Sequence, residues 1–190
     1  MTILNEETLF EVFCKGEGKQ ILDWLKKNPD NCNMKDPLRG ITPFLMACYF
    51  GEEKIIEYLF TQNIDIHQKD RTEKNAIFTA VLANRYQIIE NLYKKGVNIN
   101  EIGARFEYSP LISAAQSNYV ESVETLIRLG ADVNYKNGRE KDMLSYVENG
   151  VCKVKMAYLM KYFHLFTKEN QKRIKKIRLK RLLEGEEMKI

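Results

Sequence analysis

The chain has 190 residues, of which 44% are hydrophobic and 29% are charged, a balance typical of a folded globular protein and not of a disordered one. Its apolar runs are short, which excludes a transmembrane helix, and its first ten residues lack the basic start and long apolar stretch of a secretory signal peptide. The net charge is +4, but residues 168–190 hold nine Lys/Arg and four Asp/Glu, so the positive excess belongs to the tail.

The first part of the chain predicts two short helices. Asn5 is a suitable N-cap for a helix that continues to Cys14, and residues 20–27 form the second helix. This second helix places Ile21 and Leu25 on one face, as expected for a helix that packs against a neighbour on one side only.

Three similar units follow, and their starts lie at a fixed spacing. The strings are TPFLMA from Thr42, NAIFTA from Asn75 and SPLISA from Ser109, which are 33 and then 34 residues apart. In each unit the polar first residue is an expected N-cap, and polar, turn-rich segments such as 62–74 predict outstretched hairpin loops. The expected helices are, in pairs, 42–50 with 52–61, 75–83 with 85–94, and 109–117 with 119–128. A period of this size is typical of a stacked repeat.

A second string marks the end of each unit. It is LGADVN at 129–134, KGVNIN at 95–100, QNIDIH at 62–67, and a degraded copy, NPDNCN, at 28–33. Gly96 and Gly130 directly follow the second helices of their units, where a left-handed C-cap is expected. Unit length, helix starts and helix ends therefore all agree on one repeating structure.

The units resemble the ankyrin repeat, whose TPLHxA and GADVN motifs correspond to TPFLMA, SPLISA and LGADVN. The resemblance implies an all-α, ankyrin-like helix-turn-helix solenoid with hairpin loops and a C-terminal basic helix. Terminal repeats of a solenoid are atypical because one face meets water. We therefore divide the chain into a degenerate N-terminal capping repeat (1–36), three ankyrin-like repeats (37–141), a degenerate C-terminal capping repeat (142–166) and a basic amphipathic helical tail (167–190).

The last two segments are the least regular. Asp142 is the expected N-cap of the final unit, and residues 151–163 are its expected outer helix. Residues 168–183 contain eight Lys/Arg, with Ile174 and Ile177 one turn apart and Leu179 and Leu183 also one turn apart, which favours a basic amphipathic helix. Such a helix can cover the last repeat with a solvated basic face. Alternatively, it can bind an anionic membrane surface or nucleic acid, direct nuclear import, or be bound by a calmodulin-like protein.

The sequence contains no strong signal for catalysis or for a cofactor. The segment KGEGKQ at 15–20 is not a phosphate-binding loop, because Phe13 stands at the first glycine position and Gln20 follows the lysine. His67 and His164 are far apart, and neither belongs to a metal-ligand motif. Four cysteines without CxxC spacing suit reduced, mostly buried thiols of an intracellular protein, and the repeat alignment places Cys14 and Cys48 on the buried side of inner helices.

The resemblance implies a non-enzymatic protein–protein interaction module that acts as an adaptor or a competitive inhibitor. Ankyrin-like stacks usually bind through the hairpin tips and the groove beside the inner helices, and an arginine recurs at the tips with spacings of 32, 34 and 34 residues. Solvated loops that simply carry arginine are the alternative. The expected partner-binding residues are Arg39, Ile41, Tyr49, Phe50, Arg71, Lys74, Leu82, Arg105, Phe106, Tyr108, Arg139 and Lys141.

Arginines beside aromatic rings favour a protein partner that carries an acidic and an apolar patch. We expect a monomer without cofactors in the cytoplasm, or in the host cytoplasm or nucleus if the protein is a host-directed effector of an intracellular bacterium or a virus. The alternative function is association with a membrane or nucleic acid through the basic C-terminal helix.

Overall fold

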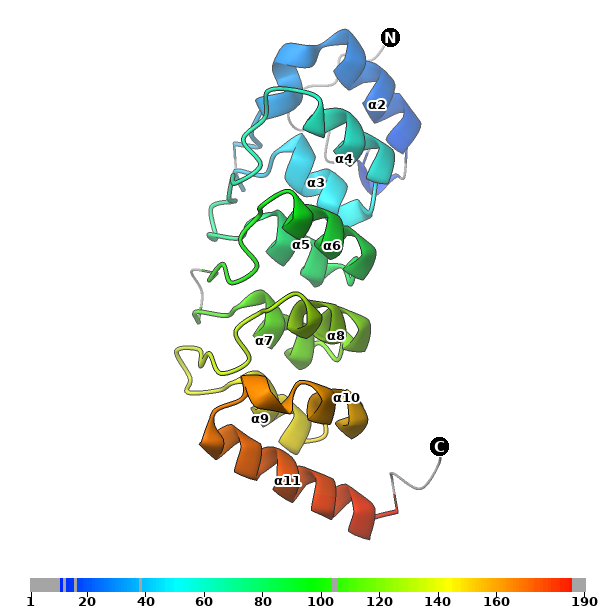
Figure 1. Ribbon diagram of the computed structural model, residues 1–190. Helices are drawn as coiled ribbons and strands as arrows, with labels where there is room; N and C mark the ends of the chain where they lie inside the picture. Colours follow the sequence, from blue (N-terminus) through cyan, green and yellow to red (C-terminus); the bar gives the residue numbers. More distant parts are fainter. Residues whose placement is uncertain (1–10, 12, 16, 38, 104–105, 186–190) are drawn as a thin grey trace.

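The fold is an elongated stack of helix pairs, running from α2 at one end to α11 at the other (Figure 1). The computed structural model describes residues 11–185 apart from residues 12, 16, 38 and 104–105. The α-helices are α2 (Gly18–Lys27), α3 (Pro43–Phe50), α4 (Glu53–Phe60), α5 (Ala76–Leu82), α6 (Tyr86–Lys94), α7 (Pro110–Gln116), α8 (Val120–Arg128), α9 (Met143–Glu148), α10 (Met156–Lys161) and α11 (Lys168–Leu183). The described chain also contains two 3₁₀ helices, η1 (Pro29–Asn33) and η2 (Phe163–Leu165). No strand occurs in the described ranges, and the expected all-α solenoid is confirmed.

The inner helices begin where the sequence predicts. The side chains of Thr42, Asn75, Ser109 and Asp142 each accept a hydrogen bond from the backbone N–H three residues later. Each cap satisfies one of the N–H groups that the first turn of a helix leaves unpaired. The four residues are therefore equivalent helix starts, which confirms the repeat register from Thr42 to Asp142.

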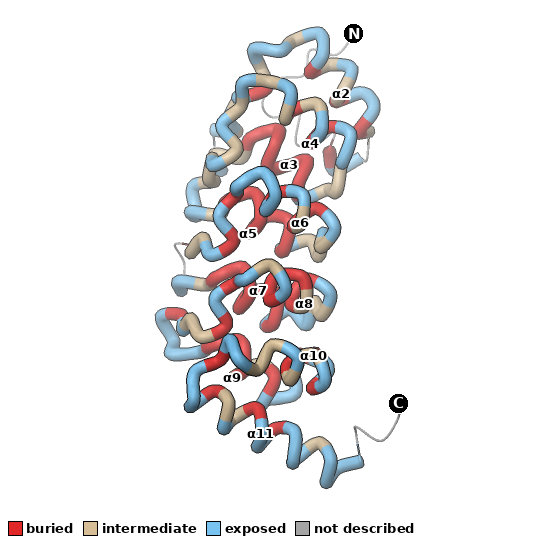
Figure 2. The backbone as a smooth tube through the Cα atoms, in the orientation of Figure 1, coloured by how far each residue is buried: buried red, intermediate tan, exposed pale blue. Residues whose placement is uncertain are grey.

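The core is continuous along the stack. The inner helices α3, α5, α7 and α9 pack in a row, and the outer helices lie beside them. Buried segments follow one another along the axis of the molecule in Figure 2. Ala47, Ala80 and Ala114 have no exposed surface, since small side chains allow neighbouring inner helices to approach closely. Each helix pair thus packs against the helix pairs on either side of it, as repeats of a solenoid do.

Side-chain amides in the turn strings connect one unit to the next. The Asn100 carbonyl oxygen accepts the backbone N–H of Asp132 at 2.9 Å. Asn134, one unit later, accepts the N–H of Thr167 at 3.0 Å and donates to the carbonyl of Leu165 at 2.9 Å. These bonds fix the register between successive units.

The predicted left-handed glycines are confirmed. Gly96 and Gly130 have φ angles of 88° and 91°, which disfavour any residue with a Cβ atom. A Cβ atom at either glycine would meet nothing within 4 Å. The backbone conformation is therefore the reason for glycine at both positions.

The expected helix over residues 151–163 is wrong in length, since α10 spans only Met156–Lys161. Residues 151–155 are outside any helix, with Cys152 and Val154 fully buried and their neighbours exposed. The Asn118 side chain also accepts the backbone N–H of Lys153 at 2.8 Å, a bond that draws this segment onto the preceding unit. Burial on alternate residues suits an extended segment that contains β-branched valines.

The expectation that Cys14 is buried is also wrong. Cys14 is exposed, and the adjacent Phe13 is buried instead, with its ring stacked 5.6 Å from that of Phe50. A large ring fills the space beside α3 better than a thiol does. Cys32, Cys48 and Cys152 are buried, as expected, whereas the predicted cap Asn5 lies outside the described residues.

The tail forms the predicted helix, and α11 packs against α9 and α10. Asn170, Ile174 and Ile177 form its buried side. Leu179 and Leu183 do not continue this side: they are 59% and 80% exposed. The helix therefore covers the last repeat with its first three turns and presents its leucines to solvent.

Candidate partner-binding surface

The hairpin loops end in tight tips that project from one edge of the stack, on the left in Figure 1. Each tip is closed by a backbone hydrogen bond, between Asp36 and Ile41, Asp70 and Lys74, Gly103 and Tyr108, and Asn137 and Lys141. The side-chain amide oxygen of Asn137 also accepts the backbone N–H groups of Arg139 and Lys141 at 2.9 and 3.0 Å. The side chains at the tips are therefore held on ordered loops.

A left-handed residue recurs at each tip. Gly40, Glu73, Glu107 and Glu140 have φ angles of 67°, 61°, 53° and 56°. Non-glycine residues adopt this region at a cost of roughly 1–2 kcal/mol, which the packed repeat must offset. Phe106, directly before Glu107, also has a positive φ of 62°, so the third tip has two left-handed residues in a row where the others have one among their described residues.

Neighbouring tips are joined by backbone hydrogen bonds. The N–H of Arg71 donates to the carbonyl of Arg39 at 2.9 Å, and the N–H of Gly138 donates to the carbonyl of Phe106 at 3.2 Å. The first tip is therefore joined to the second, and the third to the fourth.

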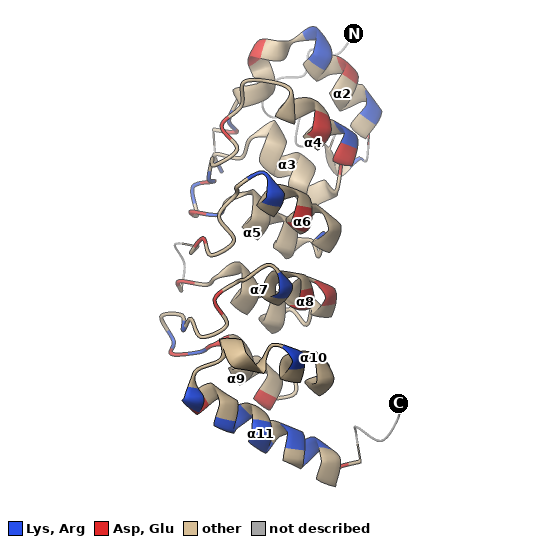
Figure 3. Ribbon diagram, viewed as in Figure 1, with Lys and Arg blue, Asp and Glu red and all other residues tan. Residues whose placement is uncertain are grey.

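The described members of the arginine series lie on this edge. Arg39, Arg71 and Arg139 are exposed, whereas Arg105 lies outside the described residues. Acidic side chains are interspersed among these cations, and Lys69 pairs with Glu101 at 2.8 Å. Figure 3 shows both signs of charge along these loops. The edge is therefore mixed in charge, and arginines alone do not distinguish a binding site on it.

Aromatic and cationic side chains meet at the third and fourth tips. The guanidinium carbon of Arg139 lies 4.0 Å from the centroid of the Phe106 ring, and the Phe106 and Tyr108 rings are 6.2 Å apart. Phe106 is 39% exposed, a large fraction for a phenylalanine. This group, Phe106 with Tyr108 and Arg139, is called the tip cluster below.

Tyr146 of α9 extends the tip cluster toward the inner helices, and sequence reasoning missed it. Burial, followed by its hydrogen bond with Tyr108, raises the pKa of Tyr146 to about 12. Tyr135 also contributes, since its hydroxyl donates to the carbonyl of Glu107 at 3.0 Å. The sequence does contain a signal for this residue. Tyr146 aligns with Ser113, 33 residues earlier in α7, so a tyrosine occupies a position at which the preceding inner helix has a serine.

The groove side of the inner helices carries two of the expected apolar contacts. Tyr49 at the end of α3 is 42% exposed and Leu82 at the end of α5 is 39% exposed. Ile41 and Phe50 are partly buried and pack on the core, so these two side chains stabilise the stack and offer less surface to a partner. Lys74 lies over the Phe78 ring at 5.8 Å, and Lys141 is exposed.

The buried thiols are poorly suited to nucleophilic chemistry. Burial raises the pKa of Cys48, Cys32 and Cys152, so that their thiolates are scarce at neutral pH. Over the described ranges, no three or more His, Cys, Asp or Glu side chains gather in a group that could hold a metal ion. The same ranges contain no helix long and apolar enough to cross a bilayer.

Comparison with known proteins agrees with the repeat structure. A family model for ankyrin repeats in three copies matches residues 10–103, and a model for a single ankyrin repeat matches residues 106–138. The chain belongs to the ankyrin repeat family. Ankyrin repeats generally bind proteins and are typically non-catalytic, and this is the coarse function that membership supports.

The similar proteins include ankyrin proteins of different kinds. The chain is 25% identical over 137 residues to alpha-latrotoxin-Lg1a of Latrodectus geometricus, covering 70% of this chain and 10% of the toxin. It is 24% identical over 138 residues to a putative ankyrin repeat protein of Rickettsia felis, covering 72% and 45%. It is 28% identical over 96 residues to ankyrin repeat and SOCS box protein 5 of Oryctolagus cuniculus, covering 50% and 29%. The chain thus spans less than half the length of each of these relatives.

Proposed function

We propose that this ankyrin protein is a non-enzymatic binding module whose main contact with a protein partner is the tip cluster. The stacking of the Arg139 guanidinium on the exposed Phe106 ring is the observation that supports this proposal. Aromatic side chains and arginine dominate the binding energy of protein interfaces. The hydrogen bonds that hold tips three and four together keep these side chains in place before binding, which lowers the entropy lost on association.

The chemistry of the tip cluster favours a partner with an apolar group beside a carboxylate. An apolar side chain fits the exposed ring of Phe106, and a carboxylate fits the guanidinium of Arg139 and the ammonium group of Lys141. Tyr49 and Leu82 supply a second apolar contact along the inner helices. An adaptor or a competitive inhibitor that acts in the cytoplasm, in its own cell or in a host cell, is consistent with such a surface.

Affinity capture with a matched pair of variants tests this proposal. Phe106→Ala/Arg139→Ala removes a ring and a guanidinium from the tip cluster. Tyr93→Ala/Arg128→Ala removes the same two groups from the outer helices α6 and α8, where Tyr93 is 41% exposed and the Arg128 side chain is 44% exposed. We expect partners bound by the wild type and by the outer-helix variant to be lost from the tip variant. Retention of all partners by the tip variant contradicts the proposal, provided that both variants melt like the wild type.

A further inference from the structure

Helix α11 has one buried side and one outward side of different composition. With about 100° per residue, the outward side opposite Ile174 and Ile177 carries first lysines and then leucines. Its residues, all exposed, are Lys168, Lys172, Lys175, Lys176, Leu179, Leu182 and Leu183. Because α11 is the last layer of the stack, no other helix of the described part of the chain lies beyond this side (Figure 1).

Of the outward lysines, Lys175 lies over the Phe163 ring at 5.6 Å, a contact that leaves its positive charge unneutralised. Elsewhere on α11, Arg173 pairs with Asp142 and Glu148, and Lys180 lies 3.8 Å from Glu184. Among the described residues, none of the four outward lysines takes part in an ion pair. Within α11 and its C-cap, the carboxylates are Glu169 in the first turn and Glu184 at the C-cap. The middle of the helix is therefore purely cationic, as Figure 3 shows.

The leucines form an exposed apolar end. Leu179, Leu182 and Leu183 are 59%, 45% and 80% exposed, although each could bury its side chain with a gain of roughly 1.5–3 kcal/mol. Residues three and four apart lie on one side of a helix, so the three side chains project together. They lie one turn beyond the lysines, so a single flat surface can contact both groups.

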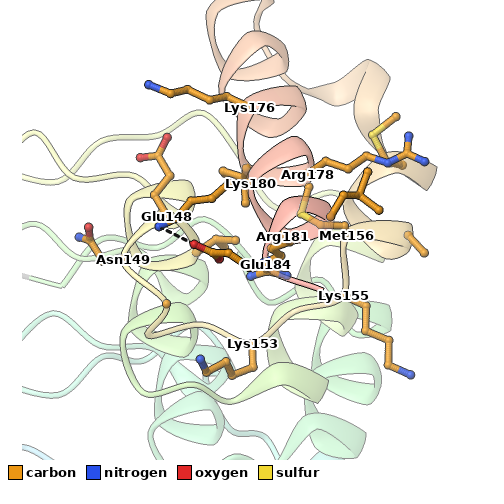
Figure 4. Close-up of a pocket in the computed structure, with 16 residues that line it drawn as sticks. Glu148, Asn149, Lys153, Lys155, Met156, Lys176, Arg178, Lys180, Arg181 and Glu184 are labelled. Carbon is orange, nitrogen blue, oxygen red and sulfur yellow. Dashed lines mark ion pairs between the residues drawn. The ribbon is translucent and has the colours of Figure 1, made fainter. Parts of the chain in front are cut away.

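A cleft beside the same helix adds further cations. Its volume is about 1670 Å³, and it lies between the second half of α11 and the segment that joins α9 to α10. In Figure 4, Lys176, Lys180 and Lys153 lie on one side of α11, and Arg178 and Lys155 lie on the other. The carboxylates Glu148 and Glu184 also line this cleft, but cations outnumber them around the leucine end of α11.

We propose that the outward side of α11 docks on an anionic lipid surface, with the leucines among the acyl chains and the lysines at the headgroups. Protein interfaces are depleted in lysine, whereas each lysine near an anionic bilayer contributes to binding. Single-stranded nucleic acids stack on aromatic side chains, and α11 has none. A membrane interface has a layer of charged headgroups and, beneath it, a layer of acyl chains. The lysines of α11 suit the first layer and its exposed leucines suit the second.

Co-sedimentation of the full chain with vesicles tests the docking. One vesicle type is phosphatidylcholine alone, and the other contains one part in three of phosphatidylserine. We expect binding to the anionic vesicles only, with loss at high salt because the charges are exposed. Lys172→Gln/Lys175→Gln should lower the partition coefficient roughly 25-fold, since each lysine contributes about 1 kcal/mol and about 1.4 kcal/mol is tenfold. Leu179→Ser/Leu183→Ser should lower it roughly tenfold or more while keeping its salt dependence.

A control variant separates docking from net charge. Lys26→Gln/Lys27→Gln removes the same charge from exposed lysines at the end of α2, at the opposite end of the stack, and should bind vesicles like the wild type. Equal loss in this control, equal binding to both vesicle types, or no vesicle binding overturns the proposal. So does binding to a short oligonucleotide or to polyglutamate without binding to vesicles. All substituted side chains are exposed, and an unchanged thermal melt confirms that the variants fold.

Discussion

Arg173 of α11 holds the N-cap carboxylate of α9, since its guanidinium donates to both oxygens of Asp142, at 3.1 Å for Nη2 and Oδ1. The same side chain reaches Glu148 at the other end of α9 at 2.8 Å. Asp142 also accepts the N–H and the hydroxyl of Ser145 at 3.0 and 2.9 Å. One arginine thus connects the tail helix to both ends of the last inner helix.

Replacement of this arginine should loosen the tail helix first. The Asp142 side chain is only 1% exposed, so Arg173→Met leaves a buried carboxylate without its cation. We expect the unfolding free energy to fall by about 3 kcal/mol. This value is at the lower end of the usual cost of breaking a buried ion pair, because the guanidinium of Arg173 is partly exposed. Denaturant unfolding measures this loss. In Asp142→Asn/Arg173→Met the buried charge is also gone, so the double variant should be the more stable of the two; an equal or lower stability contradicts the pairing.

The pair of Asp142 and Arg173 also predicts that the stability of the protein depends on pH. Burial alone would raise the pKa of Asp142, but the hydrogen bonds from Arg173 and Ser145 and the charge of Arg173 outweigh it and hold the pKa below its usual value. The unfolded-state pKa is about 3.9, so this stabilisation is complete above about pH 4 and is lost as the pH falls through the lower folded-state value.

Asp142→Asn makes this dependence measurable. Asparagine is also a good N-cap, so the variant keeps the cap but removes the titration. Below about pH 4, the unfolding free energy of the wild type should fall more steeply with pH than that of Asp142→Asn. Parallel curves for the two proteins in urea titrations would show that Asp142 is not the responsible group.

Close packing of the inner helices predicts the effect of a larger side chain. Ala114 of α7 is fully buried between α5 and α9, so Ala114→Leu should cost on the order of 1–3 kcal/mol through overpacking. Gln116→Leu places the same side chain at an exposed position of the same helix and should change stability by less than about 0.5 kcal/mol. Chemical denaturation compares the two midpoints, and an unchanged midpoint for Ala114→Leu refutes the packing.

Features that depend only on residues close together in the chain could be predicted from the sequence. Thr42, Asn75 and Ser109 cap helices through bonds that span three residues, and Gly130 is required by its own φ angle, so each leaves a local pattern. The choice between Phe13 and Cys14 for the core could not be predicted in the same way, because it depends on the shape of the space beside Phe50.

Contacts between residues far apart in the sequence could not be predicted from the sequence either. Arg173 and Asp142 are 31 residues apart, and nothing in the composition of the tail distinguishes this arginine from its exposed neighbours. The tip cluster was predicted in part, since Phe106, Tyr108 and Arg139 were expected at the tips. Their mutual stacking and the bond between Tyr108 and Tyr146 depend on the alignment of two separate units in space.

The turn asparagines predict a difference between two similar substitutions. Asn134 accepts from Thr167 and from the side-chain amide of Asn170 and donates to Leu165, whereas Asn100 receives a single bond from the next unit, from Asp132. A hydrogen bond contributes about 1 kcal/mol, and an unpaired buried group costs more. We therefore expect Asn134→Ala to cost about 2–3 kcal/mol and Asn100→Ala about 1 kcal/mol. Because the bonds from Thr167 and Asn170 to Asn134 hold the start of α11, hydrogen exchange should accelerate over residues 168–183 in Asn134→Ala alone. Equal exchange in both variants would mean that α11 is held by Arg173 and its apolar contacts without help from this turn.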